Sequence, residues 1–193
     1  MAHGKPFLGA ETLGGDVLII DQDTPTLMLK NRLAAMAKAI GGKLQHNIVI
    51  HSMEGLSLRD TLPAVIGQYP ASVLILIDNL NSVTAGVANA ADELMRFKTQ
   101  CLRPNRTILT TYHTPPTPVN KKIKDIWFGS SELMQQADSY FFLSKEGQGA
   151  LKTLHVRPVA KRQPIEYSNV TLDFHDENGM WFEFNKEEQE EQK

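Results

Sequence analysis

The stretch VLILIDNL at positions 73–80 decides the fold class of this chain. It holds five consecutive apolar residues followed by Asp78. A continuous apolar run of this length is typical of a strand that is covered on both faces of a parallel sheet. VLII at 17–20 and TILTT at 107–111 read as further short strands, and helical spacing recurs between them. The chain therefore predicts an alternation of strands and helices.

The expected fold is α/β, with a mainly parallel sheet flanked by helices and an antiparallel hairpin at the C-terminal end. The parallel strands are expected at 17–20, 48–50, 73–77, 107–111 and 140–143. Helices are expected from Thr24-Pro25 to Gly41-Gly42, from Ser57 to about Gln68, from Ala85 to about Leu102, and over 131–137. Three antiparallel strands are expected at 151–156, 170–174 and 181–184, and HDENG at 175–179 supplies the tight turn between the last two.

Composition describes an ordinary globular protein. Of 193 residues, 41% are hydrophobic and 22% are charged, and the net charge is −2. We expect one domain over 1–185 and an acidic, disordered tail over 186–193. No apolar run approaches about 18 residues and the N-terminus has no apolar signal region, so we expect a cytoplasmic protein without a membrane span. A single cysteine, Cys101, excludes a disulfide framework and a thiolate zinc site.

Acidic residues and histidines follow the predicted strands. Asp21 and Asp23 follow the run at 17–20, Asp78 ends the run at 73–77, and His51 and His113 follow two others. The carboxyl ends of parallel strands form the functional edge of α/β sheets, and an Asp at a strand tip suits a magnesium–nucleotide site. Taken alone, an Asp in such a position is more often a helix cap or turn former, and a lone histidine such as His113 is more often a loop hydrogen-bonder.

A phosphate cradle of the form G-x-x-x-x-G-K-[ST] does not occur in the 193 residues. Gly4-Lys5 is followed by Pro6-Phe7, Gly14-Gly15 precedes a strand, and Gly41-Gly42-Lys43 ends a helix. None of the three has the strand-to-helix context that the cradle needs.

Several phrases together resemble the RecA-like ATPases, in the branch of plasmid-type hexameric replicative helicases and KaiC-like proteins. These phrases are GKPFLG (4–9), VLIIDQDTP (17–25), VLILIDNL (73–80), TILTTYHTPP (107–116), GSSELMQQADSYFFL (129–143) and LHVRPVAKRQPIEY (154–167). They cover nearly the whole chain, and their order and spacing carry the resemblance. It implies a RecA-like sheet, with magnesium and ATP as cofactors.

The resemblance also implies roles for individual residues. The magnesium-associated carboxylate falls on Asp78, and the water-polarising catalytic acid on Asp23, or less favourably on Asp21. His113 takes the sensor position. Lys161 and Arg162 lie where basic finger residues reach a neighbour's nucleotide. Lys121, Lys122 and Lys124 follow the DNA-facing loop, within a stretch from Arg96 to Lys124 that has seven positive residues and no acidic one. The alternative for this stretch is a solvated helix face and loop.

Two departures from the family pattern limit these expectations. The first strand and phosphate loop of the family have no counterpart here, and an Asp stands where the family has a catalytic Glu. We therefore expect ATP to bind weakly or not at all to this chain alone.

The first hypothesis is a degenerate or truncated ATPase-type domain in DNA replication or mobile-element maintenance, which assembles with itself or with a complete RecA-like ATPase and binds DNA. The alternatives are a working ATPase whose phosphate loop comes from an upstream segment or partner, and a pure protein-interaction module.

Overall fold

The computed structural model describes residues 11, 14–39, 41–43, 45–53, 58–80, 90–112, 137–146, 152–161, 170–175 and 181–184. The chain divides into two compact units. The first comprises Met1–Leu29 and Gln45–Gln136, and the second comprises Lys30–Leu44 and Ala137–Lys193.

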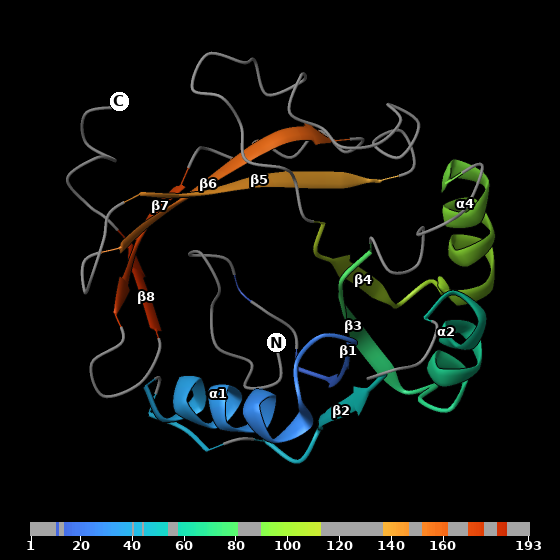
Figure 1. Cartoon of the computed structure of the whole chain (residues 1–193), viewed down its shortest axis with the longest axis horizontal. Helices are drawn as coiled ribbons and strands as arrows, with labels where there is room; N and C mark the ends of the chain where they lie inside the picture. The colour runs from blue at the N-terminus through green and yellow to red at the C-terminus, as the bar shows by residue number, and fades with distance from the viewer. Residues whose placement is uncertain are drawn as a thin grey trace. The chain divides into compact units, whose positions relative to one another are not determined.

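A parallel sheet forms the centre of the first unit (Figure 1). Its strands are β1 (Asp16–Asp21), β2 (Ile48–Ser52), β3 (Ser72–Asp78) and β4 (Thr107–Thr110), in the order β2-β1-β3-β4. Every pairing among them is parallel. β3 has a strand on each side, which confirms that the run at 73–77 is an interior strand.

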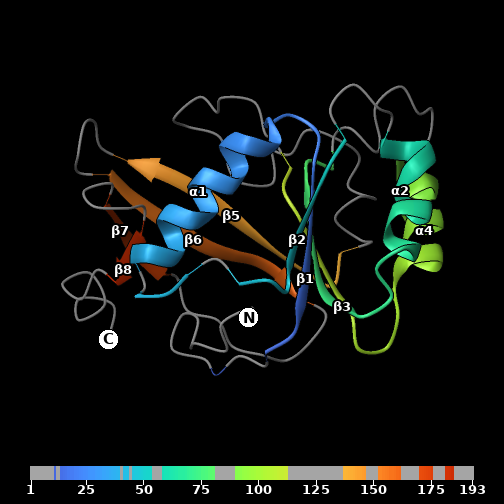
Figure 2. The same ribbon diagram turned by 90° about the horizontal axis from the view of Figure 1, so that it is seen from below.

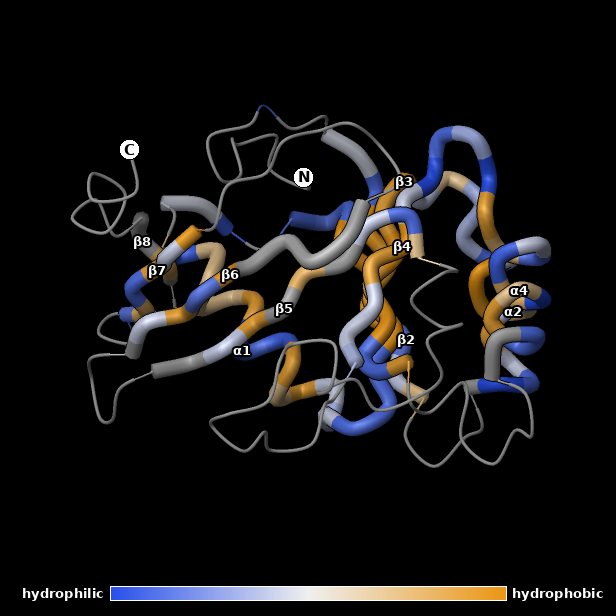
Figure 3. The backbone as a smooth tube through the Cα atoms, turned by 90° about the horizontal axis from the view of Figure 1, so that it is seen from above, coloured by the Kyte–Doolittle hydropathy of each residue, from blue (hydrophilic) through white to orange (hydrophobic). Residues whose placement is uncertain are grey.

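Two helices, α2 (Leu58–Gly67) and α4 (Ala90–Cys101), cover one face of this sheet (Figures 1 and 2). One continuous core joins Leu62 and Ile66 of α2 and Phe97 of α4 to strand residues such as Leu18 and Ile75. Figure 3 shows the hydrophobic segments concentrated on the strands. Alternate residues of each strand point to this core because side chains in a strand alternate between faces. The predicted parallel sheet with flanking helices is confirmed.

Two glycines lie where the chain leaves α1 and where it enters β1. Helix α1 (Thr26–Ala39) ends at Gly41, whose φ is 72°, a left-handed conformation that glycine adopts without strain. The N–H of Gly42 donates to the carbonyl of Ala37 at 2.8 Å and that of Gly41 to Lys38 at 2.9 Å, so the predicted stop is a Schellman motif. Before β1, a Cβ on Gly15 would lie 2.3 Å from Cγ2 of Val73, so any larger residue there would require the Val73 side chain to move.

The second unit contains an antiparallel sheet. Its strands, in the order β5-β6-β7-β8, are β5 (Ser139–Glu146), β6 (Lys152–Lys161), β7 (Val170–His175) and β8 (Trp181–Phe184). Phe174 and Phe182 are register partners with ring centroids 5.2 Å apart. The antiparallel C-terminal end is confirmed, and β7 and β8 pair from His175 and Trp181 onward. The turn expected at HDENG lies outside the described residues, except for His175.

One strand assignment was wrong. The run at 140–143 was expected in the parallel sheet, but it belongs to β5, which pairs antiparallel with β6. Phe141 is 42% exposed and Leu143 is 58% exposed, so this strand is not covered on both faces. An apolar run predicts a strand, but the choice of partner depends on contacts far away in sequence, so the run alone does not fix it.

Several expectations fall outside the described residues: the phrase at 4–9, the proline-rich loop at 114–120, most of the helix at 131–137, and the acidic tail. Among the helices that are described, none is both long and apolar enough to cross a bilayer.

Candidate functional site

The carboxyl ends of β1 and β3 lie side by side. Asp21 is the register partner of Asp78, and the N–H of Gln22 donates to the carbonyl of Asp78 at 3.1 Å. On the other side of β3, the N–H of Leu80 donates to the carbonyl of Thr111, just after β4, at 2.9 Å. The polar residues that follow three strands are therefore gathered at one edge of the sheet, as the sequence predicted from parallel pairing.

Asp21 has a structural task at this edge. It is 3% exposed, and its Oδ1 accepts hydrogen bonds from the backbone N–H groups of Asp23 at 2.8 Å and Thr24 at 2.7 Å. These contacts shape the turn between β1 and α1, in the way that Asp side chains commonly form turns. The turn-former reading fits Asp21, and the loop it shapes carries Asp23.

Asp23 is exposed, and a buried side chain holds it. The side-chain amide of Asn79, which is 5% exposed, donates to Oδ2 of Asp23 at 2.8 Å. Hydrogen bonds to an ionised acceptor are stronger than neutral ones, so this contact restrains the carboxylate. It also joins the loop after β1 to the end of β3, across 56 positions of sequence.

Asp78 is restrained in a similar way. The hydroxyl of Thr111 donates to Oδ1 of Asp78, from the residue that follows β4. The peptide bond between Asp78 and Asn79 is cis. Both candidate carboxylates are thus fixed through one oxygen by a side chain from a neighbouring strand end, and the sequence patterns gave neither Asn79 nor Thr111 a role. The available signal was their position, because each is a polar residue directly after an apolar strand.

The residues at this edge fit magnesium better than a transition metal. The candidate ligands are carboxylate and hydroxyl oxygens, the hard donors that Mg²⁺ prefers. Within the described part of the chain, no group of three or more His, Cys, Asp or Glu side chains could hold a metal. Asp78 is the residue here that could hold a magnesium ion, with water and phosphate oxygens as its other ligands, which is how Mg²⁺ is usually held at nucleotides.

The remaining predicted site residues are distributed differently. Lys161 is the last residue of β6 in the second unit. His113, Lys121, Lys122, Lys124 and Arg162 lie outside the described residues. His51, in β2, contacts the hydroxyl of Tyr69 through Nδ1 at 3.4 Å, and the two rings meet edge to face. His51 therefore makes a contact between β2 and the segment that precedes β3.

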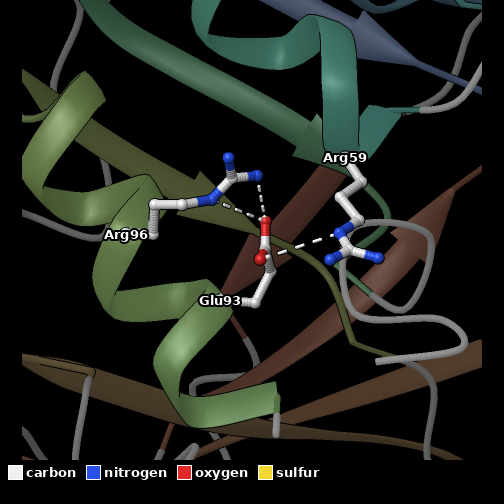
Figure 4. Close-up of polar contacts among 3 residues, drawn as sticks. All are labelled: Arg59, Glu93 and Arg96. Atoms are coloured by element: carbon white, nitrogen blue, oxygen red, sulfur yellow. Dashed lines mark hydrogen bonds and ion pairs between the residues drawn. The ribbon is translucent and has the colours of Figure 1, made fainter. Parts of the chain in front are cut away.

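Arginines at the start of the basic stretch make intramolecular contacts. Arg96 pairs with Glu93, whose side chain is buried, and Nε of Arg59 from α2 lies 3.7 Å from the same carboxylate (Figure 4). Two arginines from two helices thus neutralise one buried acid, which avoids the cost of an unpaired buried charge. Arg96 thus pairs with an acid of its own helix, and Arg59 links α2 to the same acid.

Arg106 binds backbone carbonyls around the amino-terminal end of β3. Its guanidinium donates to Ser72, Cys101 and Pro70, each at 3.1 Å, and to Tyr69 at 3.4 Å. The planar fork of five N–H donors suits several acceptors at once. Arg106 therefore ties the end of α4 to the turn before β3, and its contacts are structural.

Burial perturbs two groups near the sheet. It raises the pKa of the Cys101 thiol from 9.0 to about 11, an effect that Arg103 and Arg106 partly oppose. Burial also raises the pKa of Tyr112, just after β4. Both groups stay protonated and neutral at pH 7. The expectation that Cys101 is a structural residue within a helix agrees with its position in α4, fully buried against the sheet.

Searches for related proteins find structural likeness only. No protein-family model and no curated protein matches the chain. Among solved structures, the flagellar accessory protein FlaH from Methanocaldococcus jannaschii matches with 14% identity and a TM-score of 0.56, over 88% of this chain and 76% of that protein. The KaiC-like protein PH0186 from Pyrococcus horikoshii matches with 17% identity and a TM-score of 0.54, over 88% and 77%.

The RadB recombinase matches with 14% identity and a TM-score of 0.58, over 86% of this chain and 78% of that one. The chain therefore has the fold of RecA-like and KaiC-like ATPases, as its sequence phrases predicted. At these identities the likeness concerns the fold alone, and function has to be argued from the site.

Proposed function

We propose that this chain is a RecA-like ATPase-type domain that acts in DNA replication or mobile-element maintenance through assembly and DNA binding. One observation carries the nucleotide part of the proposal: Asp23 and Asp78 stand at neighbouring strand ends, and each is fixed by a side-chain donor. RecA-like neighbours with this fold support a nucleotide site at the same edge of the sheet.

In this proposal the two carboxylates have separate roles. Asp78 would hold magnesium directly or through water, and Asp23 would orient water molecules beside the ion, including the one that attacks the terminal phosphate. Magnesium supplies charge neutralisation for the phosphates when it is bound. His113 senses the phosphate, and Lys161 and Arg162 serve a nucleotide bound by a neighbouring subunit.

The phosphate cradle is the missing part. Backbone N–H groups and a lysine supply most of the phosphate affinity in P-loop proteins, and the 193 residues contain no such motif. We expect isothermal calorimetry of the chain with magnesium and ATP to show weak or no binding and no measurable turnover. Micromolar affinity for the chain alone would overturn this part of the proposal.

A second candidate function is a working ATPase whose phosphate loop comes from another segment or subunit. The side-chain hydrogen bonds to Asp23 and Asp78 support this candidate as well, because they hold both carboxylates in defined positions at neighbouring strand ends. Adding a complete RecA-like ATPase to the chain separates the two candidates. ATP hydrolysis in the mixture that exceeds that of the complete ATPase alone, and whose excess disappears with Asp78→Ala, favours the working enzyme. Hydrolysis equal to that of the complete ATPase alone favours the degenerate domain.

An edge strand of the parallel sheet supports the proposed assembly. Among the described strands β4 pairs with β3 alone, and the segment carries no charge, while Leu109 is 53% exposed. An uncharged edge strand offers its free N–H and C=O groups to another strand. We propose self-association, or binding to a complete RecA-like ATPase, through this edge.

DNA binding is assigned to Lys121, Lys122 and Lys124. Filter retention of single-stranded DNA at several salt concentrations tests it, since phosphate contacts weaken as salt rises. Substitution of the three lysines by glutamine is expected to abolish retention, and the matched change Arg103→Gln, at an exposed arginine, is expected to leave it intact. Equal retention by both variants would overturn the assignment to these three lysines. No retention of DNA by the natural chain would leave a pure interaction module as the better reading.

A further inference from the structure

We propose that Asn79 is the positioning residue for Asp23 and that it fixes which carboxylate oxygen the site can use. This inference rests on the proposed function, because it assigns a task within the same edge of the sheet. Asn79 directly follows Asp78 in the chain, yet its amide is directed to the acid that follows a different strand. One buried residue therefore ties the two candidate carboxylates together.

The hydrogen bond from Asn79 makes the two carboxylate oxygens of Asp23 different from each other. Oδ2 accepts the hydrogen bond from Asn79 at 2.8 Å. Asp23 is exposed, so Oδ1 remains the oxygen that a water molecule or hydrated cation can approach. A carboxylate held at one oxygen keeps a single orientation, whereas a free Asp on a loop samples several rotamers.

Burial of Asn79 makes the orientation reliable. The residue is 5% exposed, at the end of an interior strand whose backbone is paired on both sides. The loop that carries Asp23 is shaped independently by the two backbone hydrogen bonds to Asp21. Backbone and side chain of Asp23 are thus fixed from two separate elements, as functional carboxylates generally require.

The test measures Mn²⁺ binding by electron paramagnetic resonance on the full chain, with Mn²⁺ alone as the probe for a Mg²⁺ site. Asp78→Ala is expected to abolish binding. Asn79→Ala is expected to weaken Mn²⁺ affinity about tenfold, the lower end of the effect of removing a group that orients a ligand. Chemical unfolding of each variant, measured in parallel, checks that the fold persists.

A swapped pair distinguishes positioning from a structural contact. Asp23→Asn with Asn79→Asp restores one amide–carboxylate hydrogen bond but places the charge on the other residue. If Asn79 positions Asp23, the unfolding midpoint returns toward that of the natural chain while Mn²⁺ affinity stays low. If the contact only stabilises the fold, both return together, and the inference is wrong. The swap also covers the case in which Asn79→Ala does not fold.

Failure of the inference and failure of the proposed function give different results. Natural Mn²⁺ affinity in Asn79→Ala, combined with a loss in Asp23→Ala, means that Asp23 is oriented without Asn79 and overturns the inference alone. Natural affinity in both Asp23→Ala and Asp78→Ala, or no Mn²⁺ binding by the natural chain, overturns the proposed function, and the inference is overturned with it.

Discussion

The hydroxyl of Thr111 donates a hydrogen bond to Oδ1 of Asp78, and the two residues are 33 positions apart in sequence. Thr111 follows β4 and Asp78 ends β3, so the contact exists only because the two strands run parallel and in register from Leu74 and Thr107 onward. A local feature of the candidate site thus depends on the whole sheet.

Thr111→Val removes this hydrogen bond while it keeps the size and shape of the side chain. We expect the free energy of unfolding, measured by urea denaturation, to fall by about 1 kcal/mol, since the acceptor is a carboxylate but the donor is exposed. The matched control is Thr99→Val, whose hydroxyl donates to a backbone carbonyl on the exposed side of α4. Equal losses in the two variants would mean that Thr111 has no special contact with Asp78.

How much of this arrangement the sequence predicts depends on the range of the contacts. Strand and helix positions in the first unit follow from local apolar spacing, and the stop at Gly41 follows from the backbone freedom of glycine. The gathering of Asp23 and Asp78 at one edge follows from parallel pairing. Each of these inferences needs only neighbouring residues and one rule of topology.

What the sequence did not predict requires long-range partners. The run at 140–143 has the composition of a buried strand, but its antiparallel pairing with β6 depends on residues 152–161. The donors to Asp23 and Asp78 are polar residues without a motif, so only the folded sheet reveals them. Arg106 looked like a DNA-facing charge in a basic stretch, but four carbonyls that the chain brings together bind it.

Arg106→Met tests that structural role. The variant keeps an unbranched side chain but loses every donor. We expect the free energy of unfolding to fall by about 2–3 kcal/mol, because the carbonyls of the buried residues Ser72 and Cys101 lose a charged partner. Arg106→Lys is expected to recover only part of the loss, since one ammonium group cannot reproduce the planar fork. Urea denaturation measures both variants.

The control for Arg106 is Arg103→Met. Arg103 is exposed and contacts the carbonyl of its neighbour Leu102, so its removal is expected to change the free energy of unfolding by less than about 0.5 kcal/mol. A loss in Arg103→Met as large as that in Arg106→Met would show that general charge, and not the carbonyl contacts, causes the effect.

Alkaline pH is expected to destabilise the fold through Cys101. Burial raises the pKa of its thiol from 9.0 to about 11, so between these values the unfolded chain loses a proton that the folded chain keeps. The folded state then binds more protons than the unfolded state, and stability therefore falls as pH rises from 9 to 11. A shift of one pKa unit corresponds to about 1.4 kcal/mol in the free energy of unfolding, which sets how steeply stability falls over this pH range.

The variant Cys101→Ala measures how much of this pH dependence of stability comes from the thiol. The variant is less stable at every pH because it leaves a small cavity, but its stability should decline less between pH 9 and 11 than that of the natural chain. Tyr112, whose pKa burial also raises, contributes to both proteins and cancels in the difference. If the free energy of unfolding, measured by urea denaturation, declines equally in both proteins across this pH range, the raised thiol pKa is contradicted.

The proposed assembly is tested at Leu109. The side chain is 53% exposed on a strand that pairs on one side among the described strands, so a second chain can add to the sheet there. Lysine on an edge strand opposes such pairing because the charge would be desolvated at the new interface. We expect light scattering to show a concentration-dependent oligomer for the natural chain and a monomer for Leu109→Lys. Met95→Lys, at a residue of α4 with 47% exposure, is the matched control and should keep the oligomer. If the natural chain is a monomer at every concentration, or if both lysine variants dissociate alike, β4 is not the interface.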